Sequence, residues 1–175
     1  NGLANSGKGQ HIHFILDNGP YSAHYESEFS KDIEEGDHVL LAFLSRSYHE
    51  AVKNPTSFVV KKIRAGNPSD DQKMDVDFTA EHLFYSRPKG TYSGDGAQKV
   101  LLDFFLLNTE LSKGGNYVHV TINGEHEFKI TDWAPYALEG LPMGENTIQL
   151  VLKDKNGKFV EGPFNKVKRT VTLSK

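Results

Sequence analysis

Two stretches of the sequence carry the same pattern, and this repetition constrains the fold more than any other feature. HIHFILDNG at 11–19 and YVHVTING at 117–124 both place apolar side chains at alternate positions, keep a histidine at the same point of the alternation, and end in Asn-Gly. Self-similarity at one spacing predicts two copies of one structural unit. Two further pairs of segments keep an offset of 106–108 residues, namely 36–44 with 144–152 and 57–63 with 163–171.

Almost every segment of both copies alternates as a β-strand does, and no window of about 12 residues keeps the period of a helix. Asp17-Asn18-Gly19 and Asn123-Gly124 supply the positive φ values that tight hairpin turns need. These signals predict an all-β fold of two tandem immunoglobulin-like antiparallel β-sandwich repeats. The ten expected strands lie at 10–17, 20–26, 38–45, 57–64, 82–86, 99–108, 116–123, 125–131, 145–153 and 166–173.

The two copies differ in what precedes them. An apolar run, KVLLDFFLLN at 99–108, leads into the second copy and has no counterpart before the first. We therefore expect residues 1–66 to form an incomplete sandwich whose chain starts inside the repeat; a first copy that is naturally shorter is the alternative. The polar stretch 67–77 is expected to be a linker, and residues 78–175 are expected to form the complete second repeat.

The alternation assigns a core face to each copy. In the second copy Val118, Val120 and Ile122 predict the core face and His119 lies on the wet one. The equivalent core residues of the first copy are Ile12, Phe14, Leu16, Leu40, Ala42 and Leu44. The other face of the first copy is also apolar, so we expect the second copy, a partner subunit in a homodimer, or a loop to cover it. Its apolar residues are Ile15, Val39, Leu41 and Phe43.

Composition excludes several classes of partner and site. The chain of 175 residues has a net charge of −3, which argues against a nucleic-acid-binding surface. No run is long and apolar enough to predict membrane insertion of the mature domain. Because cysteine is absent, any metal site must use imidazole, carboxylate or tyrosinate ligands.

Histidines of the first copy form a candidate metal site. His11 and His13 are two residues apart on a strand, so their side chains leave the same face. We expect His24 on the returning hairpin strand to lie opposite one of them, and His49 to fold over the same end. Imidazole ligands of this number suit zinc or copper. The alternative is that these residues are ordinary polar side chains on a solvated strand face.

Aromatic and cationic side chains near the expected loops suggest a site for a glycan or protein ligand, because planar rings stack on sugars and on partner side chains. The candidates are Tyr21, Tyr25, Arg46, Tyr48 and Trp133. Structural use is the alternative, above all for Trp133, which follows a strand. No catalytic residues are assigned, because Ser45 and Ser47 have no glycine-rich oxyanion loop near them.

The run GQHIHFILDNGPYSAHYE, followed by FLSRSYHEAVKN, YSRPKGTYSGD, EGLPMGENTIQLVL and EGPFN, resembles a group of uncharacterised bacterial proteins that are exported to the cell envelope, often as lipoproteins. The resemblance covers most of the chain. It implies tandem immunoglobulin-like domains and an extracytoplasmic location in the periplasm or on the cell surface, and it carries no established activity.

The sequence therefore predicts a non-enzymatic exported module with a binding or structural role at the envelope. Its ligand would be an unknown protein or glycan. The alternative function is a periplasmic zinc- or copper-binding protein that uses the histidines of the first copy.

Overall fold

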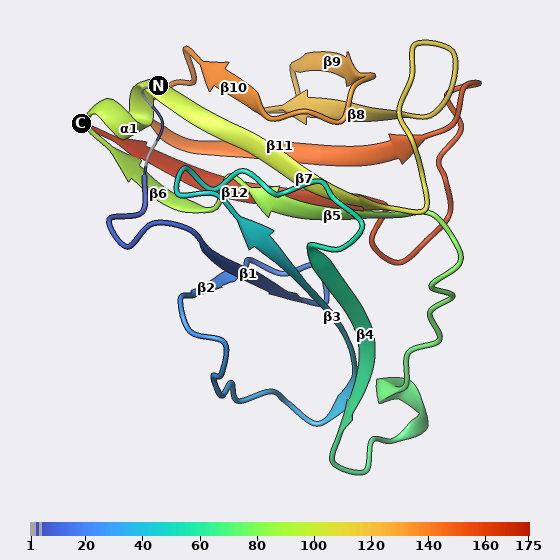
Figure 1. Ribbon diagram of the computed structural model, residues 1–175. Coiled ribbons are helices and arrows are strands. Elements are labelled where there is room, and N and C mark those ends of the chain that lie inside the picture. The colour runs from blue at the N-terminus through green and yellow to red at the C-terminus, as the bar shows by residue number, and fades with distance from the viewer. Residues whose placement is uncertain (1–2, 4) are drawn as a thin grey trace. The chain divides into compact units, whose positions relative to one another are not determined.

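The computed structural model describes residue 3 and residues 5–175 (Figure 1). The chain divides into two compact units: the first unit is Asn5–Phe78, and the second consists mainly of Thr79–Lys175. The sequence-based boundaries were 1–66, 67–77 and 78–175. No helix within the described residues has both the length and the apolarity needed to cross a membrane.

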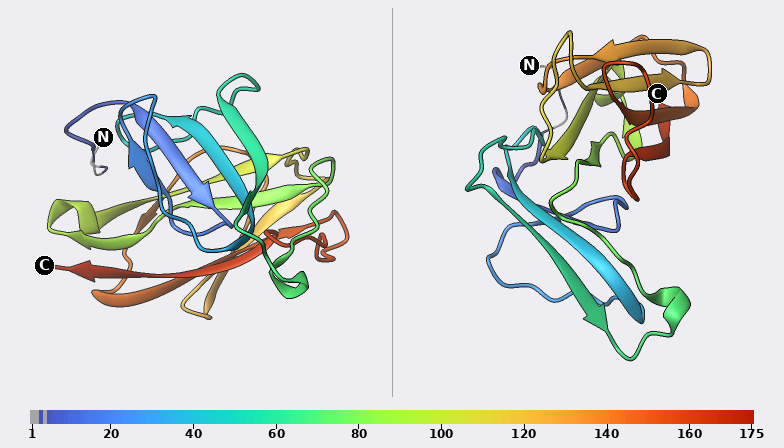
Figure 2. Two further views of the ribbon diagram at one scale, coloured as in Figure 1. Left: turned by 90° about the horizontal axis from the view of Figure 1, so that it is seen from below. Right: turned by 90° about the vertical axis from the view of Figure 1, so that its right-hand side faces the viewer.

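The first unit is one four-stranded antiparallel sheet, in the order β2-β1-β3-β4 (Figure 2). A single turn of 3-10 helix, η1 (Asp70–Gln72), follows the sheet. All four strands coincide with expected ones to within a few residues: β1 (His11–Leu16), β2 (Ser22–His24), β3 (Gly36–Ser45) and β4 (Phe58–Ala65).

The second unit is a sandwich of two sheets. One sheet has the order β10-β7-β5, and the other has the order β6-β12-β11-β8-β9. All pairs are antiparallel except β6 with β12. The strands of the smaller sheet are β5 (His82–Arg87), β7 (Lys99–Leu107) and β10 (Tyr136–Glu139). Those of the larger sheet are β6 (Gly90–Ser93), β8 (Tyr117–Ile122), β9 (His126–Ile130), β11 (Gly144–Lys153) and β12 (Lys166–Ser174).

The core of the second unit lies between its two sheets. Inward side chains of β7, such as Phe104, meet those of β8 and β11, such as Val120 and Leu150, and all three are fully buried. The expected core face of the second repeat is therefore confirmed, and so is the all-β fold class. Two short strands, β6 and β10, and one helical turn, α1 (Asp95–Gln98), were not expected. Each spans four residues.

The repeat is visible in the topology. The sheet order β2-β1-β3-β4 of the first unit recurs as β9-β8-β11-β12 in the second. The register is also the same, because His13 pairs with Phe43 in the first unit and His119 pairs with Val151 in the second. The two copies are therefore equivalent residue for residue along their central strands.

The faces of the equivalent sheets differ in burial. In the first unit the face that carries His11 and His13, here called the histidine face, is buried, and its Ile15, Val39 and Leu41 are fully buried. The expectation that this apolar face is covered agrees with that burial. The expected core face is more open: Phe14 is buried, but Leu44 is 51% exposed. The core assignment of Leu44 was therefore wrong, because no second sheet lies over this face among the described residues of the first unit.

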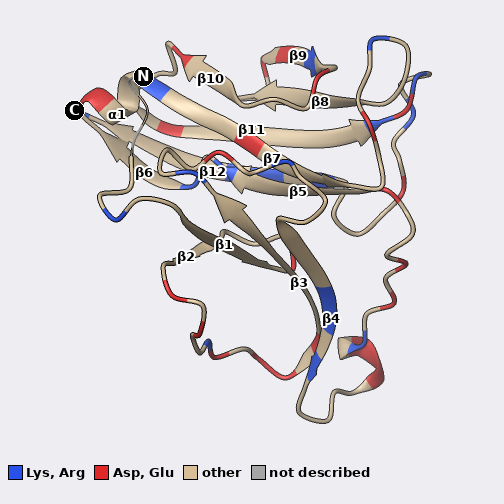
Figure 3. Ribbon diagram, viewed as in Figure 1, with Lys and Arg blue, Asp and Glu red and all other residues tan. Residues whose placement is uncertain are grey.

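Segment 67–77, expected to be a linker, is hydrogen-bonded to the first unit. The backbone N–H of Asn67 donates to Glu35, and that of Met74 donates to Asp37. Asp37 also accepts two hydrogen bonds from Arg64 of β4, which together with Lys62 hold the pKa of this carboxyl well below its usual range. Figure 3 shows cationic residues along β4 and acidic residues in η1.

The buried side chain of Asn165 joins β5 to the loop that precedes β12. Its Nδ2 donates to Glu81 O at 2.8 Å and to Val160 O at 3.1 Å, and its Oδ1 accepts the N–H of Leu83 at 2.8 Å. Asn165 is fully buried. These backbone groups therefore have no nearby water to replace the amide.

Replacing Asn165 with Ala should lower the free energy of unfolding by about 2–4 kcal/mol, since several buried groups would lose a partner at about 1–3 kcal/mol each. Urea denaturation followed by circular dichroism measures the change. The matched control is Asn156→Ala at an exposed turn, for which a change below about 0.5 kcal/mol is expected. Equal effects of the two substitutions would contradict the role given to Asn165.

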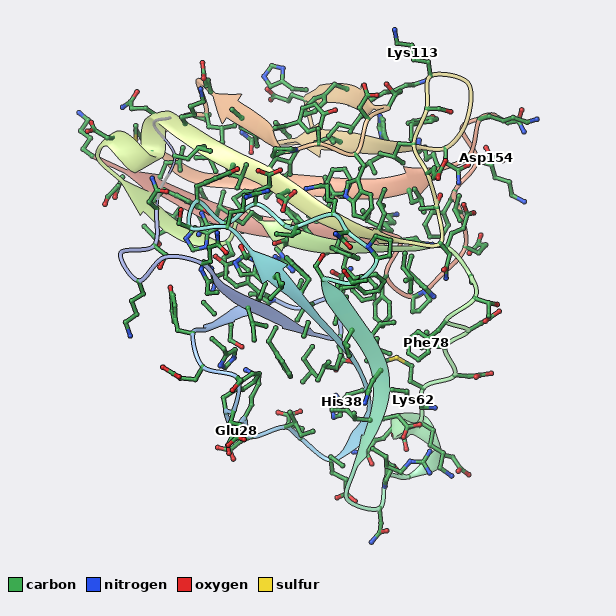
Figure 4. All side chains as sticks on the ribbon, viewed as in Figure 1. Glu28, His38, Lys62, Phe78, Lys113 and Asp154 are labelled. Carbon is green, nitrogen blue, oxygen red and sulfur yellow. The ribbon has the colours of Figure 1, made fainter. Side chains whose placement is uncertain are left out.

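The turn after β1 adopts the conformation that its sequence predicts. Asp17 and Asn18 have φ values of 50° and 55°, and the N–H of Gly19 donates to Leu16 O. Asp17 Oδ2 accepts a hydrogen bond of 2.6 Å from His38 Nδ1, and Oδ1 accepts one from the N–H of Val39. The hydrogen bond to Asp17 raises the pKa of His38 above its ordinary value. Figure 4 labels His38 on the ribbon.

This raised pKa predicts the direction of a pH effect. Protonation of His38 stabilises the folded chain, so the contribution is fully present below the ordinary histidine pKa and is lost as the pH rises through the folded value. Asp17→Asn keeps the turn and removes the charge, and it should flatten this part of the pH profile. Urea midpoints from about pH 6 to about pH 9 test it. A variant whose stability falls as steeply as that of the unaltered chain would contradict the assignment.

Candidate metal centre

Three histidines of the first unit bring one ring nitrogen each to a common point. His11 Nε2 lies 3.0 Å from His13 Nε2 and 3.0 Å from His49 Nδ1, and the last two atoms are 3.3 Å apart. We call these three nitrogens the histidine triad. All lie within one unit of the chain.

Strand geometry positions two of the three histidines. His11 and His13 alternate with Ile12 on β1, so both side chains leave the histidine face. Their strand is fixed on the other side by β3, where His11 pairs with Ser45 and His13 with Phe43. Both histidines are buried, with 5% and 0% of their surface exposed.

The third ligand comes from a tight turn after β3. The N–H of His49 donates to Arg46 O at 2.8 Å, and the N–H of Arg46 donates to Glu50 O at 2.9 Å. His49 itself has a φ of 71°, in the left-handed region that few side chains occupy. The folded turn is what directs Nδ1 of this half-buried histidine toward β1.

Hydrogen bonding alone cannot satisfy the triad. Each neutral ring nitrogen is either a donor or an acceptor, and three mutually contacting atoms cannot alternate between the two roles. At least one of the three contacts must therefore join two donors or two acceptors. A cation removes this conflict, because all three nitrogens then present lone pairs to it.

The surroundings of His11 favour the lone-pair form. Its Nδ1 lies 2.9 Å from Gly9 O, and a carbonyl oxygen can only accept, so Nδ1 carries the proton and Nε2 is left as an acceptor. Metal-ligating histidines characteristically donate their other ring N–H in this way, which fixes the tautomer and the ring orientation.

The separations fit a metal of the expected size. Zinc–nitrogen bonds are about 2.0–2.1 Å long, so two ligands of a tetrahedral ion are about 3.3–3.4 Å apart. The triad distances of 3.0–3.3 Å are close to this value. A cation about 1 Å out of the plane of the three nitrogens would be about 2 Å from each of them.

Two tyrosines line the same site. The ring of Tyr21 stacks on that of His13 at 3.6 Å, and its hydroxyl is 3.3 Å from His49 Nδ1. Tyr25 lies with its ring centre 5.1 Å from that of His11, and its hydroxyl contacts Ser6 Oγ. Sequence reasoning grouped these tyrosines as ligand-binding residues and did not connect them with the histidines. The sequence signal that could have connected Tyr21 with the histidines was its spacing from the hairpin turn.

Other candidates lie away from the triad. His24 pairs with Ile12 and not with His11 or His13, a difference of one residue that puts it on the opposite face of the sheet. There it stacks on Phe29 at 3.5 Å, and burial, with the charge of Lys31, lowers its pKa. The expected position of His24 is therefore corrected, because a one-residue change of register exchanges the faces.

The remaining ligand-binding candidates are dispersed. Tyr48 donates a hydrogen bond of 2.5 Å to Glu50, and Arg46 contributes backbone groups to the turn. Trp133 belongs to the second unit, where its Nε1 donates to Phe104 O at 2.9 Å and its ring meets Phe105 edge to face. Trp133 thus packs as part of the sandwich.

A separate hollow of about 520 Å³ lies in the second unit. It opens between β9 and β10, which are the edge strands of the two sheets. Phe128 and Tyr136 supply aromatic surface, and Glu125 and Glu139 supply carboxylates. This combination offers a binding surface that does not involve the histidine triad.

The tautomer of His11 can be tested directly. In the metal-free chain we expect Nδ1 to carry the proton and Nε2 to be deprotonated, since Gly9 O accepts from Nδ1. Long-range nitrogen–proton NMR correlation of the histidine rings distinguishes the two tautomers. Observation of the Nε2–H form for His11 would contradict the lone-pair assignment.

Comparison with known proteins assigns no role to these residues. No protein-family model matches the chain, and no curated protein matches it. Among solved structures, the chain is similar to the fibronectin(III)-like modules of Clostridium thermocellum CbhA, with 11% identity, a TM-score of 0.40, and coverage of 97% of this chain and 80% of that one. It is also similar to SGBP-B of the Bacteroides ovatus mixed-linkage glucan utilization locus, solved in complex with a mixed-linkage heptasaccharide, with 13% identity, a TM-score of 0.22, and coverage of 95% of this chain and 60% of that one. At these values neither similarity assigns a ligand or a residue role to this chain.

Proposed function

We propose that this chain is a non-enzymatic, exported metal-binding module whose first unit holds zinc or copper(II) through the histidine triad. The single observation that carries this proposal is the convergence of three ring nitrogens to within 3.0–3.3 Å of one another. Histidines on an ordinary solvated strand face would turn their polar atoms toward water. His11 and His13 are buried instead.

The ligand set favours these metals over others. Imidazole nitrogen suits zinc, copper, nickel and iron, whereas magnesium and calcium prefer oxygen ligands. No described carboxylate joins the triad, and the chain contains no cysteine. Among divalent ions, copper(II) generally binds nitrogen ligands most tightly and zinc accepts the tetrahedral geometry without strain.

The groups near the triad support binding without catalysis. Ser45 directs its hydroxyl toward the backbone oxygens of Arg46 and Glu50, and the Glu50 carboxylate accepts the hydrogen bond from Tyr48. A serine that acts as a nucleophile would need a base in contact with its hydroxyl. Neither residue is arranged for acyl transfer.

An extracytoplasmic setting completes the proposal. Support comes from the resemblance to exported envelope proteins noted in the sequence and from the all-β architecture. The hollow between β9 and β10 would serve a glycan or protein ligand of the envelope, because aromatic surface beside carboxylates suits both sugar rings and cationic side chains. This second role is independent of the metal.

Addition of zinc or copper(II) to metal-free protein should raise the thermal midpoint. A ligand that binds only the folded chain stabilises it by RT ln(1 + [L]/Kd), about 2.7 kcal/mol at a hundredfold excess over Kd. Differential scanning calorimetry at increasing metal concentration measures the shift, and His13→Ala and His49→Ala should each abolish it.

The matched control is His24→Ala, because His24 lies on the opposite face of the same sheet. That variant should keep the full shift. The metal assignment fails if neither metal moves the midpoint of the unaltered chain, or if loss of His24 is as damaging as loss of His49. Testing His49 as well as His13 keeps the experiment interpretable should the buried His13→Ala change weaken the fold.

A further inference from the structure

We infer that the phenol oxygen of Tyr21 is the fourth ligand of the metal held by the histidine triad, so that the site is closed and four-coordinate. This inference rests on the proposed metal binding and deepens it. A triad with an open fourth position would leave room for a water or a substrate, which is the arrangement of catalytic zinc sites. With Tyr21 in the fourth position, the site would bind the metal without leaving a position for water or a substrate.

The Tyr21 oxygen lies at a ligand-to-ligand distance from one nitrogen of the triad. It lies 3.3 Å from His49 Nδ1, the separation expected for two ligands of one tetrahedral ion with bonds of about 2.0–2.1 Å. The same separation occurs between His13 Nε2 and His49 Nδ1. The phenol oxygen is thus as far from His49 Nδ1 as His13 Nε2 is.

The Tyr21 ring is held in place by its neighbours. It is 3% exposed and stacks on the imidazole of His13 with an interplanar angle of 12°. Stacking sets the plane of the ring, and the hydroxyl of this ring lies 3.3 Å from His49 Nδ1. A fixed ring loses little rotamer entropy when a metal binds, so the ligand is preorganised.

Local sequence places Tyr21 on the correct face. In the β1–β2 hairpin Ala23 is opposite His13, and Tyr21, two residues earlier, leaves the same face of the chain. Pro20 precedes it and restricts the backbone between the turn and β2. The hairpin that carries His11 and His13 therefore also delivers the fourth ligand.

Bond formation changes the chemistry of the phenol. On coordination the hydroxyl gives its proton to solvent, and the phenolate oxygen donates an electron pair to the metal, as ligands generally must be deprotonated to bind. With copper(II) such a bond gives a visible phenolate-to-copper charge-transfer absorption that imidazole ligands alone do not produce. Zinc would use the same ligands without giving a visible absorption.

Copper(II) titration of the full chain, followed by visible absorption, tests the inference with two matched variants. Tyr21→Phe keeps the ring that stacks on His13 and removes only the oxygen. Tyr25→Phe removes a hydroxyl from the other tyrosine beside the triad. We expect the charge-transfer band in the unaltered chain and in Tyr25→Phe, its loss in Tyr21→Phe, and a copper Kd for Tyr21→Phe that is weaker by about 10–100-fold, the scale on which metal sites respond to loss of a supporting group.

Azide provides a second readout. An azide-to-copper band should appear in Tyr21→Phe, where the fourth position is open, and not in the unaltered chain. If the unaltered chain binds copper without the phenolate charge-transfer band, and Tyr21→Phe has the same copper Kd, the Tyr21 inference is wrong. Metal binding by the histidine triad would still be supported. A band lost in Tyr25→Phe instead, or azide binding to the unaltered chain, also overturns it. Failure of the unaltered chain to bind copper or zinc overturns both the inference and the proposed function.

Discussion

The three ring nitrogens of the histidine triad are in mutual contact, and these contacts cannot all be favourable hydrogen bonds. Because an odd ring of contacts cannot alternate donors with acceptors, the triad is stable only when something supplies positive charge or when one contact is left unfavourable. Gly9 fixes the proton of His11, β3 fixes the spacing of His11 and His13, and the Arg46–His49 turn holds the last ligand. Several independent segments thus converge on one arrangement that would be costly without a cation.

The duplicated sheet shows how such a site can arise within an ordinary fold. The positions of His13 and His119 are equivalent in register, yet His119 is paired with Glu127 at 3.4 Å on a polar face. The first unit uses the same face for buried apolar residues and for the triad. Its opposite face, which corresponds to the core of the second unit, is the more open one. The two units therefore share a sheet topology but differ in which face of the sheet is the more buried.

Period and turn chemistry predicted the hairpin turns, the residues on each face of β1 and all the described strands except β6 and β10. Each of these features depends on neighbours in sequence. Burial of each face depends on what lies over it, which alternation does not encode, and Leu44 was misassigned for that reason. The strand period predicted correctly that the side chains of His11 and His13 lie on the same face of β1. The position of His24 was not predicted correctly because hairpin register must be known to a single residue. Tyr21, predicted as a ligand-binding residue, was not connected with the histidines because its stacking on His13 is a contact between segments.

The β1–β3 register also determines where the first unit can vary in length. One inserted residue inside β1 would turn His11 to the other side of the sheet, because each added residue exchanges the faces of those beyond it. The exposed stretch from 26 to 32 carries no such register constraint, since doubling the length of a loop costs only about 0.6 kcal/mol of closure entropy. Insertions and deletions compatible with the site are therefore confined to the loops, and a cargo peptide or tag could be introduced there without disturbing the ligands.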